Sequence, residues 1–351
     1  MKFRLYIFFV LLVFQGMTQD FHFSQTSQSP LLINPGCAGA FDGWERISLN
    51  QRNQWMGSNS KFTTTNFSFD GNLYKNLRKP ASHIGFGIQF YNDMGGDSKF
   101  GTRNGSLTLS GILPMAPGHQ ISIGIQGGFG SKRGDISKLT FENQWNGTDF
   151  DPSLASGEVN SLNSFAYAEV ASGIYYIYDA GKSSFSRNNE SKIQLGLSGY
   201  HLNQPKLRYI QGTTDRLKRK YVFHGSIIKD ILDSKWSIDA GVFQFIQGSH
   251  KETMVSTMFR YRLQEGTKQT GFYGEAHVGF GLNYRYKDAI IPAFMLDMQS
   301  LKFMLSFDFT TSQLRRANGS NSLELSLVYT NLHNAIFKSR NHNKKSLKVK
   351  H

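Results

Sequence analysis

The sequence predicts an all-β protein whose mature part closes into an antiparallel transmembrane β-barrel of about 14 strands. The chain starts with an export signal, its body alternates apolar and polar residues with a period of two, and glycines lie inside the predicted strands. Of its 351 residues, 14% are aromatic and only 18% are charged. Disorder requires few aromatic residues and high charge, so this composition excludes a disordered chain.

Residues 1–18 have the features of a signal peptide. Lys2 and Arg4 precede the apolar run 5–14, and small residues follow it at a suitable cleavage position. A run of about ten residues is too short for a membrane helix, which needs about 20. We therefore expect the mature chain to begin near residue 19 and to leave the cytoplasm.

The body of the chain carries the pattern of β-strands. Ile121, Ile123 and Ile125 alternate with small or polar residues, and Phe303 to Phe309 repeat the pattern. Successive side chains of a strand point to opposite faces, so each such window has one apolar and one polar face. Strands are expected near residues 44–55, 60–70, 82–93, 98–113, 119–132, 162–178, 186–203, 218–231, 234–247, 251–264, 270–286, 289–297, 299–312 and 320–330.

The length and number of these strands favour a barrel over a secreted β-sandwich. Sandwich strands usually have about 5–6 residues, whereas crossing a bilayer takes about 9–11. An even number is typical of bacterial outer-membrane barrels. Aromatic residues near strand ends suit an interfacial girdle, although they also fit a sandwich core: Trp44, Trp55, Tyr91, Tyr176, Tyr178, Tyr200, Trp236 and Tyr329.

Glycines inside strands suit a curved sheet with a crowded lumen, because they bend the sheet and occupy little space. Residues 19–43, in contrast, do not alternate, and they contain the turn residues Asn34-Pro35-Gly36. We expect this segment to lie in or under the lumen of the barrel at 44–330 as a plug, the alternative being an unstructured lead-in. The strand glycines are Gly85, Gly87, Gly124, Gly127, Gly128, Gly130, Gly196, Gly199, Gly279 and Gly281.

Charged residues on the first strand predict which of its faces is the lumen. Arg46 and Arg52 share one face, and arginine in lipid costs about 2–4 kcal/mol at mid-depth. That face is therefore the lumen, and Asp70 is a candidate partner for the two arginines.

The tail 331–351 contains six Lys or Arg residues and no acidic one, so we expect it to be disordered and to bind anionic partners. Both ends of an even-stranded barrel are expected on the periplasmic side, which places this tail in the periplasm. Export makes nucleic acid an improbable partner, even though the formal charge of the whole chain is +14.

The sequence contains few signals of a catalytic or ligand-binding site. It contains no GxSxG, HExxH or P-loop motif, and its histidines lack ligand spacing. Cys37 is interpreted as a small apolar residue, and Asp135, Asp149 and Asp151 are a weak signal for Ca²⁺. We predict no enzyme activity, no cofactor and no metal site.

Short motifs along the mature chain carry a family resemblance. They are Asp20-Phe21-His22-Phe23-Ser24-Gln25, Asn34-Pro35 with Gly39, Arg52-Asn53-Gln54-Trp55, Asp70, and a C-terminal group around Tyr284-Arg285 and Asp288 to Pro292. In this order and spacing they resemble the PorP/SprF family of the type IX secretion system of Bacteroidetes. The family usually has Pro in place of Phe21 and an apolar or aromatic residue in place of Cys37. The matching positions are His22, Phe23, Ser24, Gln25, Asn34, Pro35, Gly39, Arg52, Gln54, Trp55, Asp70, Tyr284, Arg285, Asp288 and Pro292.

The resemblance implies an outer-membrane β-barrel that serves protein secretion and, in many relatives, gliding motility, with no catalytic residues. It implies contact with outer-membrane lipids and with periplasmic components of the apparatus, or pairing with one large secreted surface adhesin. From the residues alone, a porin-like barrel that transports small solutes is the alternative, and a lipid-modifying barrel enzyme is a more distant one.

Overall fold

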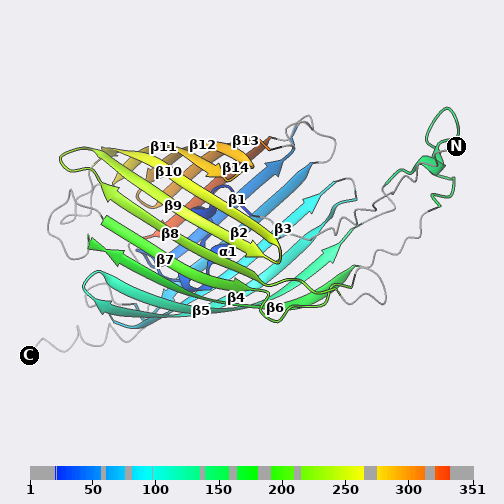
Figure 1. Ribbon diagram of the computed structural model, residues 1–351. Helices are drawn as coiled ribbons and strands as arrows, with labels where there is room; N and C mark the ends of the chain where they lie inside the picture. The colour runs from blue at the N-terminus through cyan, green and yellow to red at the C-terminus, as the bar shows by residue number, and fades with distance from the viewer. Residues whose placement is uncertain are drawn as a thin grey trace, which may run out of the picture.

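The computed structural model describes residues 20, 22–56, 61–75, 81–96, 98–134, 139–157, 164–180, 191–208, 215–264, 275–312 and 321–332 of the chain. Within these residues, fourteen antiparallel strands follow one another around a closed barrel, which is completed by pairing of β1 with β14 (Figure 1). The expected all-β class, closed barrel and strand number are confirmed. No helix in this described part is long and apolar enough to cross a membrane.

The strands are long, from 10 residues in β1 to 17 in β4. Residues 181–190 and 265–274, where two expected strands began, lie outside the described part, as do the whole predicted signal peptide 1–18 and residues 333–351 of the predicted tail. The strands are β1 (Glu45–Gln54), β2 (Phe62–Leu73), β3 (His83–Gly95), β4 (Phe100–Ala116), β5 (His119–Arg133), β6 (Phe165–Asp179), β7 (Ser191–Tyr200), β8 (Lys220–Asp230), β9 (Trp236–Gln247), β10 (His250–Gln264), β11 (Ala276–Arg285), β12 (Ala289–Met298), β13 (Leu301–Thr310) and β14 (Ser322–Asn331).

The two ends of the barrel differ in their connections. β1 begins and β14 ends at the same end, where the N–H of Trp44 donates to the carbonyl of Asn331 (2.8 Å); we call this end the terminal mouth. The opposite end, the loop mouth, carries the long connections between β5 and β6, which include η4 (Glu142–Gln144), and between β7 and β8. Outer-membrane barrels have short turns on the periplasmic side and longer loops outside, so the loop lengths predict that the terminal mouth faces the periplasm.

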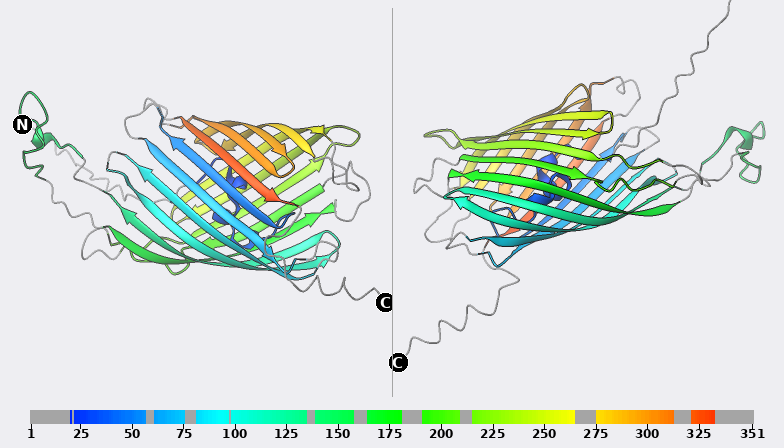
Figure 2. Two further views of the ribbon diagram at one scale, coloured as in Figure 1. Left: turned by 180° about the vertical axis from the view of Figure 1, so that it is seen from behind. Right: turned by 60° about the horizontal axis from the view of Figure 1, so that its bottom comes forward.

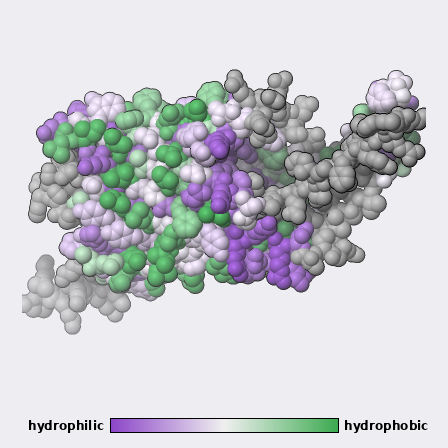
Figure 3. Space-filling model, viewed as in Figure 1, coloured by the Kyte–Doolittle hydropathy of each residue, from purple (hydrophilic) through white to green (hydrophobic). Residues whose placement is uncertain are grey.

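The strands have one apolar and one polar face. On β5, Ile123, Ile125 and Phe129 point outward and are 54%, 61% and 75% exposed, whereas Ser122 and Gln126 are buried in the lumen. In Figure 3, hydrophobic residues spread over the middle of the barrel, and hydrophilic residues gather at the end that carries the β9–β10 turn. An apolar outer band around a polar lumen is the pattern of a barrel in a bilayer.

The aromatic residues near the strand ends divide between the two faces. Trp236 and Tyr329 are exposed on the outer face, as expected for an interfacial girdle. Tyr91 and Tyr200 instead line an inner pocket, and the Tyr200 hydroxyl donates to the carbonyl of Leu31 (2.8 Å). For these two residues the girdle prediction is wrong, because their position in the alternation points them into the lumen.

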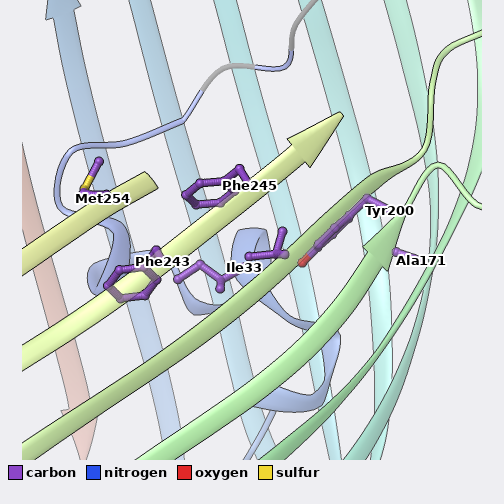
Figure 4. Close-up of a cluster of buried hydrophobic side chains, with 7 residues drawn as sticks. Ile33, Ala171, Tyr200, Phe243, Phe245 and Met254 are labelled. Carbon is purple, nitrogen blue, oxygen red and sulfur yellow. The ribbon is translucent and has the colours of Figure 1, made fainter. Parts of the chain in front are cut away.

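Residues 22–43, which we call the lumen segment, lie inside the barrel (Figure 2). The segment contains η1 (Thr26–Gln28), α1 (Pro30–Ile33) and η2 (Pro35–Cys37). Ile33 packs in a buried cluster with Tyr200 of β7, Phe243 and Phe245 of β9, and Met254 of β10 (Figure 4). The main core of the molecule therefore lies in the lumen, between this segment and the inner wall.

Candidate functional site in the lumen

The lumen segment runs from one mouth of the barrel to the other. At the loop mouth, Asp20 contacts His201, just beyond β7, and its N–H donates to Gln247 Oε1 at the end of β9 (3.0 Å). At the terminal mouth, Gly43 leads into Trp44 and β1. The start of β1 and the end of β14 lie at the same mouth, as expected for an even number of strands. Residue 20 lies at the opposite mouth, because the chain crosses the lumen before β1 begins.

Two inward carboxylates hold the start of the lumen segment. The backbone N–H groups of Ser24 and Gln25 donate to the two oxygens of Glu324 on β14 (2.6 and 2.8 Å). The Ser24 hydroxyl donates to Asp308 Oδ2 on β13 (2.7 Å), and Gln25 Nε2 donates to Ser306 Oγ (3.0 Å). Both carboxylates are buried, and hydrogen bonds to a charged acceptor are among the stronger ones in proteins. These bonds fix the segment to the β13–β14 side of the wall.

Two buried arginines complete this carboxylate cluster. Arg52 and Arg285 each donate to Asp308 Oδ2 at 3.1 Å. Arg285 also donates to Ser24 Oγ (2.7 Å) and to Asp288 in the turn after β11 (3.0 Å), while Arg52 donates to the carbonyl of His22. A buried charge is tolerated when it is paired and hydrogen-bonded, and here each arginine binds both the wall and the segment. Motif residues from both ends of the sequence thus meet at one place.

His22 binds a different part of the wall. Its Nε2 lies 2.8 Å from the carboxylate of Glu252 on β10, and its ring stacks on Phe245 with 6.2 Å between centroids. Burial lowers the pKa of His22 despite the neighbouring carboxylate. Phe23, the next motif residue, is buried as well. The side chains of 22–25 therefore face several strands at once.

Asn34 fixes the middle of the segment. Its Nδ2 donates to the carbonyl of Ile174 on β6 (2.8 Å) and lies 3.2 Å from the ring of His224 on β8. Its Oδ1 accepts the N–H of Gly36 (2.8 Å), which caps η2, and Pro35 occupies the first position of that turn. The side-chain amide of Asn34 therefore bonds to the wall through its nitrogen and to the turn through its oxygen.

Asp70 fixes the end of the segment. It accepts the N–H of Gly39 (3.0 Å) and two bonds from Arg46, which faces it across the β1–β2 ladder (2.8 and 2.9 Å). Gly39 has φ +68, and a Cβ there would lie 2.8 Å from the Cα of Gly85, so this close approach requires glycine. The expected partnership of Asp70 holds for Arg46, whereas Arg52 pairs with Asp308 instead.

Glycines in the wall make room for the segment. A Cβ on Gly124 of β5 would lie 2.3 Å from the carbonyl oxygen of Pro35, and one on Gly173 of β6 would lie 2.1 Å from the amide oxygen of Asn34. These distances are far shorter than van der Waals contacts. At Gly124 the added Cβ would clash with a backbone atom, which cannot move aside as a flexible side chain can. The wall and the segment are therefore shaped to each other.

Replacing Gly124 with Val is expected to force the segment off the wall and to destabilise the protein by about 1–3 kcal/mol, the usual cost of overpacking. The matched control is Gly127→Val on the same strand, because Gly127 meets nothing within 4 Å. Urea unfolding of both variants in detergent measures the effect. Equal stability of Gly124→Val and Gly127→Val would contradict the packing of Pro35 on β5.

Asp20 forms an ionic clamp at the loop mouth. His201 lies between it and Glu169, with its two ring nitrogens 2.7 Å from the two carboxylates, and Lys220 lies 3.3 Å from Asp20. Burial alone would lower the pKa of His201, but the two carboxylates outweigh it and raise this pKa to about 9. Burial alone would raise the pKa of Asp20, but His201 and Lys220 hold it below its usual range.

This clamp is expected to release at alkaline pH. The pKa of His201 is raised above its ordinary 6.5, so the stability it contributes is complete below pH 6.5 and is lost as the pH rises through about 9. The contribution of Asp20 persists down to acidic pH, because its pKa is lowered. A spin label on Ser27→Cys, with Cys37→Ser, should gain mobility above pH 9 in the wild-type background and show no such step with His201→Gln. A step that survives His201→Gln would contradict the clamp.

Four of the predicted site residues lie outside these contacts. Gln54 lies at the end of β1, where Trp55 packs edge-on against Phe62 (4.9 Å). Tyr284 points outward on β11, and Pro292 points outward on β12. The β12–β13 ladder is interrupted at Pro292, which has no N–H to donate.

Sequence reasoning missed the wall residues that receive the segment. Asp308 and Glu324 stand on the polar side of two clearly alternating windows, between Phe307 and Phe309 and between Leu323 and Leu325. A buried acidic residue is costly unless it is paired. The two inward acidic residues could therefore have been predicted to bind a partner inside the lumen. The identity of the partner depends on register around the whole barrel, which a local pattern does not contain.

A cavity of about 320 Å³ lies between the lumen segment and part of the inner wall. Its lining includes Met254, Met258 and Met304 on one side and the paired Lys192 and Asp42 on the other. Within the described residues, no three His, Cys, Asp or Glu side chains are placed to hold a metal ion.

Burial raises the pKa of Cys37 to about 12, so this residue is a neutral thiol at physiological pH. It packs in a second buried cluster with Ile112 of β4, and with Tyr175 and Ile177 of β6. The lumen is therefore arranged to hold a polypeptide segment through hydrogen bonds and packing.

Comparison with known proteins gives one family match. The model of a family described as type IX secretion system membrane protein PorP/SprF matches residues 16–329, which include the lumen segment and nearly all of the barrel. No curated protein sequence matches the chain.

Several solved structures also resemble the chain, at low sequence identity. A deletion mutant of the monoaromatic hydrocarbon channel TodX is 10% identical, with a TM-score of 0.46 over 88% of this chain and 95% of that one. The toluene transporter TbuX of Ralstonia pickettii is 10% identical, with a TM-score of 0.45 over 86% and 93%. BamA from Haemophilus ducreyi, lacking POTRA domains 1–3, is 9% identical, with a TM-score of 0.40 over 82% and 70%.

Proposed function

This chain belongs to the PorP/SprF family of type IX secretion system membrane proteins, and on that premise we propose that it is a non-enzymatic component of the secretion and gliding apparatus. It is an outer-membrane protein, because its family is a membrane family and its closed barrel has an apolar outer band around a polar lumen. Its role is to bind other proteins of the system at the membrane.

The observation that carries this proposal is the filled lumen. The lumen segment is bound to the wall near Glu324, near Asn34 and near Asp70, so the barrel interior is used to hold polypeptide. A transport barrel needs a continuous path for its solute, and here the segment lies across that path. We propose that the segment acts as a plug and that partner proteins bind at the two mouths.

The two mouths suit different partners. The terminal mouth faces the periplasm, so periplasmic components of the apparatus are proposed to bind there, with the basic residues 333–351 adding positive charge. The loop mouth faces the cell exterior, where a large secreted surface adhesin is the proposed partner.

Deletion of the gene tests this proposal. Loss of an adhesin from the cell surface, or loss of gliding, with normal uptake of small solutes, is the expected result. Restoration by the wild-type gene but not by a form lacking residues 22–40 would link the defect to the lumen segment. Normal secretion and gliding combined with impaired solute uptake would contradict the proposal and favour a transport barrel.

A further inference from the structure

The outer face of β10 and β11 carries an apolar groove of about 470 Å³. Its walls are cross-strand pairs, and the short side chain of Thr257 lies between the bulkier Val255 and Phe259 along β10. The groove therefore runs along the strands within the lipid-facing band. Its lining residues are Val255, Thr257, Phe259, Phe280, Gly281, Leu282 and Tyr284.

Two lysines lie beyond the groove, on the side of the loop mouth. Lys251 is exposed and shares the outward face of β10 with Val255, four residues further along. At about 3.3 Å per residue, the two lie about 13 Å apart along the strand. Lys287 is exposed in the turn after β11, with its Nζ 5.2 Å from the ring centroid of Tyr286. Apolar residues, then tyrosines, then cations follow one another toward this mouth.

The acidic residue beside Lys287 is already paired with an arginine. Asp288 stands in the same turn as Lys287, and its carboxylate accepts a bond from Arg285 at 3.0 Å. Arg285 belongs to the buried carboxylate cluster, so this pair is part of the lumen architecture. Lys251 and Lys287 therefore leave a positive charge at the upper end of an apolar groove.

We propose that this groove is a binding site for one phosphorylated, acylated lipid of the outer leaflet, with an acyl chain over Thr257 and the phosphate near Lys251 and Lys287. The charges are complementary, because a lipid phosphate is anionic and each cation near a membrane surface contributes about a factor of five to such binding. The position of the groove also fits a lipid of the outer leaflet. The loop mouth faces the cell exterior, and the groove lies in the apolar band below it, where acyl chains lie.

Native mass spectrometry of the purified full-length barrel in detergent, with added hexa-acylated lipid A, tests this site. The wild-type protein should retain one lipid, and the double variant Lys251→Gln/Lys287→Gln should bind about 25-fold more weakly, from two factors of about five. Dephosphorylated lipid A should bind to the wild type as weakly as the phosphorylated form binds to the double variant. Thr257→Phe should reduce binding independently, because it fills the groove.

Matched controls are Lys229→Gln, an exposed outward lysine near the terminal mouth, and Ile125→Phe, an outward substitution on β5, five strands away from β10. Both should bind lipid A like the wild type. The proposal would be overturned if the double variant or Thr257→Phe bound as tightly as the controls did, or if dephosphorylation had no effect. A dimer that formed through cysteines placed at 257 in the membrane would also overturn it, because a second copy would then be the occupant.

Discussion

Deleting residues 22–40 is expected to turn the closed barrel into a conducting pore. Barrels of 8 strands are filled by their own side chains, whereas those of 16–18 strands leave an aqueous channel. With fourteen strands, this lumen is filled because the segment packs against glycines such as Gly124 and against Tyr200. In planar lipid bilayers, the wild-type protein should give little or no single-channel current, and the deletion variant should give steady current.

The control is an equally long deletion, residues 139–157, within the long connection between β5 and β6. This deletion leaves the lumen contacts in place and should not open the pore. Heat-dependent migration on gels verifies that both variants form barrels. A folded barrel that lacks 22–40 and yet stays closed would show that the segment is not what blocks the lumen.

The second large effect is expected from Asp308→Ala. Asp308 Oδ2 accepts bonds from Ser24, Arg52 and Arg285 in a buried site. Removing it leaves two buried arginines without this partner, and breaking a buried ion pair in this way usually costs about 3–5 kcal/mol. We expect that loss in the free energy of unfolding in urea, together with faster proteolysis of the segment after Ser24.

Asp297→Ala is the control for this experiment. Asp297 also faces inward and pairs with a cation, Lys302, at 3.2 Å, but that lysine is about one-third exposed. A more accessible pair contributes about 0–1 kcal/mol, so this variant should be nearly neutral. If Asp308→Ala is as mild as Asp297→Ala, the carboxylate cluster does not hold the segment.

Local patterns were sufficient to predict the wall of the barrel. Each window such as 119–132 has one apolar and one small or polar face, which identifies both the strand and its lumen side. The Arg46–Asp70 pair could also be predicted from local patterns, because the two residues face each other across adjacent strands. The aromatic girdle was predicted from position along the strands without regard to face, which is why Tyr200 was misplaced.

The contents of the lumen required information that no window contains. Arg52 and Asp308 are 256 positions apart and meet only because β1 closes onto β14. The direction of the lumen segment is also not encoded locally, since Asp20 contacts residues near β7 and β9 rather than near β1. Turn residues such as Asn34 and Pro35 indicated a bend, and only the closed barrel shows that the bend rests on β5 and β6.

The most direct test is cross-linking of the lumen segment in intact outer membranes. In a Cys37→Ser background, His22→Cys should couple to Glu252→Cys through a short thiol-specific cross-linker, because these side chains face each other inside the barrel. It should not couple to Thr253→Cys, the adjacent residue whose side chain bonds to Gln244 on the outer face. Equal coupling to both positions, or coupling to neither, would contradict a barrel whose own N-terminal segment fills its lumen.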